Sequence, residues 1–73
     1  MGEHVIVKFE TYRDGEFWCA RGLGISIFTQ GKTYEKLLRN LSEAALLHFD
    51  EMVRAGERLS LLLLSEMEVG SAA

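Results

Sequence analysis

The most reactive side chains in this 73-residue chain belong to one cysteine and two histidines. Cys19 would act as a nucleophile only if a nearby base or a helix N-terminus favoured its thiolate form. Its neighbours Phe17 and Trp18 are typical of a strand and no such base is close in sequence, so we interpret Cys19 as a small packing residue. His4 and His48 lie far apart, and no Cys/His group has the spacing of a zinc site. We therefore expect no catalytic thiol, no metal and no cofactor.

Alternating apolar residues predict three strands in the first half of the chain. The alternation runs over 5–12, with Val5, Val7 and Phe9 on one face. Gly15 supplies the positive φ angle of a tight turn, so 17–21 returns as the second strand of a hairpin. The alternation resumes over 25–29. We expect a three-stranded antiparallel meander.

A helix should follow the third strand. Gly31 permits a sharp turn out of the sheet, and the Thr33 hydroxyl is placed to cap the first free N–H groups of the helix. Apolar residues then recur every three or four positions to about Val53, and this stripe should cover the sheet. Gly56 fits the helix C-terminus because glycine adopts the left-handed conformation readily. The stripe consists of Tyr34, Leu37, Leu38, Leu41, Ala44, Ala45, His48 and Met52.

The last predicted element is a strand over 58–64 whose two faces are both apolar. The order β-β-β-α-β predicts an α+β fold in which one helix packs on the sheet. We expect a single domain over residues 1–73, with an ordered core of about 4–69.

More apolar surface is present than this fold needs, because one helix covers only one face of a sheet. In the simplest strand register the uncovered face would carry Ile6, Trp18, Ala20, Phe28, Leu62 and Leu64. On the helix, a second set lies away from the main stripe and consists of Leu46, Leu47 and Phe49. Exposed apolar patches mark interaction sites, and a tryptophan is a frequent anchor. The alternative is a register one residue different, which would send some of these side chains into the core.

Composition favours association with protein. A short chain builds a marginal core unless a disulfide, a metal or oligomerisation supplements it. The single cysteine excludes an internal disulfide, so we expect a homodimer or higher homo-oligomer. The net charge of -3 argues against a domain that grips a phosphate backbone.

We expect no targeting signal. Its N-terminus has no basic segment leading into an apolar run, and the longest apolar run, Leu61 to Leu64, is far too short to cross a bilayer. We expect a cytoplasmic protein with no membrane contact. The single asparagine and single glutamine are typical of heat-adapted proteins.

Two short motifs stand around the predicted helix start. Residues 28–36 read Phe-Thr-Gln-Gly-Lys-Thr-Tyr-Glu-Lys, and residues 40–44 read Asn-Leu-Ser-Glu-Ala. The first motif is similar to a signature of the HicB-type antitoxin family, in which an aromatic residue and Ser/Thr are followed by Gln-Gly, Asp-Thr and x-Glu-Glu. The second motif is similar to the Asn-Ile-x-Glu-Ala signature of the same family. Residues 14–18 also resemble that family's turn and aromatic second strand, so the resemblance covers most of the chain. Departures are Ile25-Ser26 in place of a Pro-Gly, and Lys36 in place of an acidic residue.

The resemblance implies a truncated RNase H-like fold and a domain that binds and neutralises an mRNA-cleaving toxin. Many members add a C-terminal DNA-binding segment, but the residues after Val69 are too few for one, so we expect no DNA reading. An acidic domain that covers a basic RNA-binding surface is electrostatically reasonable.

Three other functions are open. The first is a solitary dimeric interaction module that has no toxin. An RNase H-like enzyme would need a carboxylate cluster holding two metal ions, and Glu10 is the only carboxylate within the first strand. An RNA-binding sheet would stack bases on Trp18 and Phe28, but basic residues beside them are few. We expect a non-catalytic protein-interaction domain.

Overall fold

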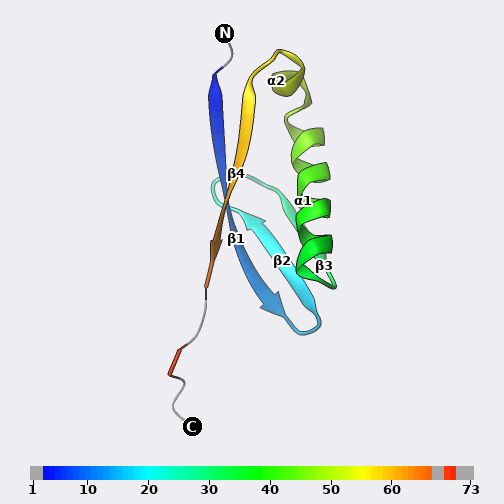
Figure 1. Cartoon of the computed structure of the whole chain (residues 1–73), viewed down its shortest axis with the longest axis vertical. Helices are drawn as coiled ribbons and strands as arrows, with labels where there is room; N and C mark the ends of the chain where they lie inside the picture. Colours follow the sequence, from blue (N-terminus) through cyan, green and yellow to red (C-terminus); the bar gives the residue numbers. More distant parts are fainter. Residues whose placement is uncertain (1–2, 67–68, 71–73) are drawn as a thin grey trace.

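The computed structural model describes residues 3–66 and 69–70. Its elements are β1 (His4–Asp14), β2 (Phe17–Gly22), β3 (Phe28–Gly31), α1 (Tyr34–His48), α2 (Asp50–Arg54) and β4 (Arg58–Ser65), as Figure 1 shows. The predicted α+β class is confirmed, with two helical segments in place of one. Residues 67–68 of the predicted ordered core lie outside the described part of the chain.

The four strands form one mixed sheet in the order β3-β2-β1-β4. β1 and β2 pair antiparallel, as do β2 and β3, so the predicted meander is confirmed. β4 pairs with β1 in parallel, which the sequence analysis did not predict. The helical segments carry the chain from one edge of the sheet to the other, and α1 lies against one face (Figure 1).

The first hairpin decides which side chains face α1. Asp14 pairs with Phe17, so the turn holds only two residues, and Gly15 takes a φ of 62° there. This register places Ala20 opposite Thr11, on the same side as the inward residues of β1. Ala20 is fully buried in the core. The prediction that Ala20 lies on the uncovered face is therefore wrong.

The third strand begins later than predicted, at Phe28 and not at residue 25. The Gly22 N–H donates to the Ile27 carbonyl at 2.8 Å, so the chain folds back on itself after β2 before it pairs again. Ile27 is buried within this loop and joins the core cluster. The apolar residues before Phe28, which we predicted to begin the third strand, thus belong to a loop that packs against the core.

α1 begins as predicted. The Lys36 N–H donates to the Thr33 Oγ1 at 3.1 Å, which confirms Thr33 as the N-cap. The buried residues of α1 are Leu37, Leu41 and Ala45. His48, which we expected on the same stripe, is exposed. Neither helix of the described part of the chain is long and apolar enough to span a membrane.

The helix breaks at Phe49, whose φ of -110° and ψ of 29° are not helical. Phe49 lies four residues after the buried Ala45 and packs against the core cluster, half-buried. The predicted position of Phe49 on an outer helix surface is therefore wrong.

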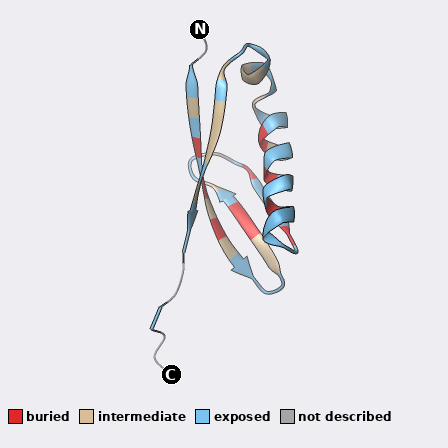
Figure 2. Cartoon of the chain, in the orientation of Figure 1, coloured by how far each residue is buried: buried red, intermediate tan, exposed pale blue. Residues whose placement is uncertain are grey.

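The core lies between α1 and the neighbouring strands, and Figure 2 shows the buried residues on β1, β2 and the sheet-facing side of α1. Thr11 is the buried polar residue of the described core, and its Oγ1 lies 3.0 Å from the Ser65 Oγ. That hydrogen bond satisfies the hydroxyl and ties β1 to β4. No residue of β4 is fully buried, although three of its leucines pack partly against the core.

Candidate functional site

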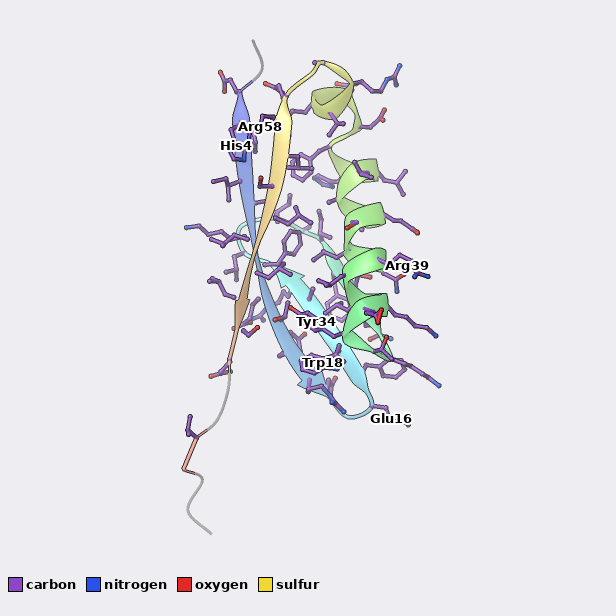
Figure 3. The ribbon with its side chains drawn as sticks, viewed as in Figure 1. His4, Glu16, Trp18, Tyr34, Arg39 and Arg58 are labelled. Atoms are coloured by element: carbon purple, nitrogen blue, oxygen red, sulfur yellow. The ribbon has the colours of Figure 1, made fainter. Side chains whose placement is uncertain are left out.

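Trp18, the predicted anchor of the uncovered sheet face, lies on the helix-covered side. It stands opposite Arg13 on β1, and its ring meets Tyr34 of α1 edge to face, with centroids 5.2 Å apart (Figure 3). The Arg13 guanidinium carbon lies 5.0 Å from the same ring centroid, in cation–π geometry. Trp18 is half-buried and packs against the core. The structure thus corrects its predicted position on the same face as Phe28.

The uncovered face still carries large apolar side chains. Ile6 and Phe28 are each 56% exposed, Leu62 is 44% exposed and Leu64 is 46% exposed. Ile6, Leu62 and Leu64 lie on the same face of the neighbouring strands β1 and β4. Leu62 is opposite Lys8 of β1, which is two residues after Ile6 and therefore on the same face. We call Ile6, Leu62 and Leu64 the open-face cluster.

Phe28 is separated from the open-face cluster by charge. The pairing places Leu64, Glu10, Arg21 and Phe28 in one row across all four strands. Arg21 donates to the Glu10 carboxylate in the middle of this row. The apolar surface predicted as one patch is therefore two, with an exposed ion pair between them.

The outer helix surface also differs from its prediction. Leu46 is 52% exposed and Leu47 is 81% exposed, so both remain surface residues. They face different features of the molecule. Leu46 lines a shallow groove of about 200 Å³ between α1 and β4, together with Leu59 and Leu61. Leu47 borders the hollow at the junction of α1 and α2.

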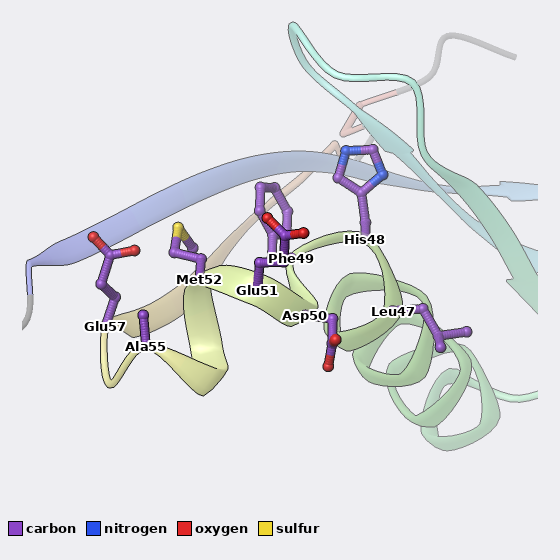
Figure 4. A pocket seen from close by; sticks show the side chains of 8 residues that line it. All are labelled: Leu47, His48, Phe49, Asp50, Glu51, Met52, Ala55 and Glu57. Atoms are coloured by element: carbon purple, nitrogen blue, oxygen red, sulfur yellow. The ribbon is translucent and has the colours of Figure 1, made fainter.

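That hollow has a volume of about 650 Å³ and is open to solvent (Figure 4). Its lining includes His48 and three carboxylates, those of Asp50, Glu51 and Glu57. Figure 4 shows the side chains of His48 and Asp50 pointing away from one another. Asp50 accepts a hydrogen bond from Arg54 at 3.0 Å, one turn later in the helix. The polar groups do not converge, so the hollow has the geometry of a surface depression.

The side chains considered above as possible nucleophiles or metal ligands lie either in the core or on the surface. Cys19 is 1% exposed, as expected of a packing residue, and its thiol is free. Glu10 is held in its ion pair with Arg21. Within residues 3–66 and 69–70, no three His, Cys, Asp or Glu side chains are grouped so that they could hold a metal ion.

Several motif residues have clear structural roles. A Cβ on Gly31 would lie 2.6 Å from the Leu37 backbone nitrogen, so glycine is required where β3 touches the start of α1. We predicted a turn role for Gly31, but the close approach of α1 is the reason for it. Gly56 has a φ of 88° after α2, as predicted for a helix end.

Asn40 has a role that sequence reasoning missed. Its side-chain amide donates to the Gln30 carbonyl at 2.8 Å and so ties α1 to β3. Asn40 is not one of the apolar stripe residues of the helix, but its approach to β3 depends on the fold. Gln30 and Asn40 belong to the two motifs described above, and the bond between them joins those motifs in space.

Comparison with known proteins adds no relative. The chain matches no family model. No curated protein matches it, and no solved structure matches its fold. The resemblance to HicB-type antitoxins therefore rests on the motif residues alone.

Proposed function

We propose that this chain is a non-catalytic protein-interaction domain that associates with itself and presents its remaining apolar surface to a second protein. The observation that carries the proposal is the exposure of large apolar side chains around β4. The open-face cluster lies on one side of that strand and Leu46 on the other. Exposed apolar surface of this kind costs free energy in water unless another protein covers it.

The second protein that best fits the motif resemblance is an mRNA-cleaving toxin, which HicB-type antitoxins neutralise. The chain carries a net charge of -3, which complements the basic surface that a ribonuclease uses to hold RNA. Leu47 is the most exposed large apolar residue of the helices and borders the hollow of Figure 4. We assign the toxin to this side, at the junction of α1 and α2.

The test uses the product of the adjacent gene, provided that it is a short, basic chain with a central histidine. We expect the two proteins to co-purify, and we expect the domain to stop cleavage of a labelled mRNA by that ribonuclease. Leu47→Glu should weaken neutralisation by at least about tenfold, because a charge would be buried in the contact. Arg39→Gln is the matched control, because Arg39 lies on the same helix and points to solvent (Figure 3).

Two results would contradict this assignment. If the adjacent ribonuclease neither binds nor loses activity, the chain is a solitary interaction module without a toxin. If Arg39→Gln and Leu47→Glu weaken neutralisation equally, the toxin does not bind at the junction of α1 and α2.

Two rival functions have their own tests. Trp18 and Phe28 face opposite sides of the sheet and offer no common stacking platform, which counts against RNA binding. A salt-dependent shift of labelled RNA by the purified domain would favour it. Cleavage of labelled RNA with divalent metal, lost on Glu10→Ala, would show that the domain is an enzyme.

A further inference from the structure

β4 is the longer of the two edge strands of the sheet. β4 is the last strand of the sheet order and pairs with β1 over eight consecutive residues without a bulge. β3, at the opposite edge, is only four residues long. Proteins protect long apolar edges with charges, prolines or bulges, because unpaired N–H and C=O groups are a template for another strand. β4 has none of these within its leucine run, and none of its residues is fully buried (Figure 2).

The charges at the ends of this strand are self-complementary. Arg58 and Glu66 are the only charged residues between positions 58 and 66, and Leu62 lies midway between them. Arg58 stands at the start of β4 (Figure 3), and Glu66 is the exposed residue that follows its end. An antiparallel pair of β4 strands centred on Leu62 would place Arg58 opposite Glu66 of the second copy. Twofold symmetry would make this contact twice.

We propose that β4 pairs antiparallel with β4 of a second copy, with the twofold axis at Leu62, so that two four-stranded sheets become one. This proposal rests on the self-association proposed above and names its surface and register. A pair centred on Leu61 would place Arg58 opposite Leu64, and one centred on Leu63 would place Glu66 opposite Ser60. Among the residues that the structure describes, the Leu62 register is the one of these three that matches opposite charges, which favour a cross-strand pair.

The same arrangement covers apolar side chains on both faces of the strand. On the open face, Leu62 meets Leu62 of the second copy, and Leu64 meets Ser60. On the helix side, Leu61 meets Leu63 of the second copy beside the groove that Leu46 lines. A single interface at the β4 edge would thus involve both the open-face cluster and Leu46, which we had predicted to belong to two separate surfaces. Leu47 remains free for a different protein.

Cysteine cross-linking tests the register directly. In a Cys19→Ala background, Leu62→Cys places two thiols opposite one another, with Cα atoms about 4.5–5.5 Å apart, within the range of a disulfide. Leu64→Cys is the matched control, because Leu64 is on the same face and almost equally exposed. Its two copies would stand four residues apart along the strands, about 13 Å, which is too far for a disulfide. We expect mild oxidation to cross-link Leu62→Cys and to leave Leu64→Cys as separate chains.

A charge exchange provides a second test that needs no disulfide. Arg58→Glu should weaken self-association by about tenfold through like-charge contact with Glu66, and adding Glu66→Arg should restore it. If the unmodified chain is dimeric but Leu62→Cys fails to cross-link, the β4 pairing is overturned while self-association stands. Equal cross-linking of the two variants, or no rescue by Glu66→Arg, would overturn the register. A monomeric chain would overturn both self-association and the pairing, and toxin binding would be unaffected.

Discussion

The Trp18 ring of β2 packs edge to face against Tyr34 in the first turn of α1, at an interplanar angle of 79°. This contact fastens the helix to the end of the hairpin (Figure 3). The only tryptophan of the chain therefore packs between the sheet and α1. The exposed large apolar residues of the uncovered face are leucine, isoleucine and phenylalanine.

Breaking this pair should destabilise the fold. We expect Trp18→Ala to lower the free energy of unfolding by about 2–3 kcal/mol, somewhat below the loss for a fully buried aromatic residue. A double-mutant cycle with Tyr34→Ala, measured by urea denaturation and circular dichroism, should give a coupling of about 1 kcal/mol. Additive losses would mean that the two rings contribute independently.

Much of the fold follows from short-range chemistry that can be recognised in the sequence. The turn at Gly15 predicts the hairpin, the alternation of Val5, Val7 and Phe9 predicts the buried face of β1, and Thr33 predicts the start of α1. Each of these depends on a few neighbouring residues. The leucines of β4 were also recognised as apolar on both faces, and Leu62 and Leu64 are indeed exposed.

The errors arise where one residue of register or one bend decides the outcome. The face of Trp18 depends on the number of residues in the hairpin turn, because a shift by one residue moves every side chain of β2 to the other face. Phe49 packs against the core at the break between α1 and α2, and no glycine or proline in the sequence marks that break. The parallel pairing of β4 with β1 depends on the whole chain path. A local pattern contains none of this information.

Phe49 and Leu47, which lie on either side of the end of α1, should differ in their contribution to stability. Phe49→Ala should cost about 2–3 kcal/mol of unfolding free energy, because this half-buried ring packs against the core. Leu47→Ala should change stability by less than about 0.5 kcal/mol, because its side chain is exposed. Thermal or urea unfolding of the two variants measures the difference. Equal costs would place Leu47 in the core or Phe49 outside it.

Gly31 tests the contact between β3 and α1. Gly31→Ala should cost about 2–3 kcal/mol, because its Cβ would meet the backbone of Leu37 and Lys36, which cannot move without shifting the helix. Gly15→Asn is the control, since Asn tolerates a positive φ and a Cβ there has open space. We expect Gly15→Asn to be nearly neutral in urea denaturation. A neutral Gly31→Ala would contradict the close approach of α1.

The mass of the chain in solution tests the central proposal, association through the apolar surface around β4, most directly. Light scattering coupled to size-exclusion chromatography, at micromolar concentration, should give twice the 8.2 kDa of a single chain. Leu62→Glu should return the mass to that of one chain, because it would place two negative charges against each other at the twofold axis. A single-chain mass for the unmodified protein throughout the micromolar range would contradict the account.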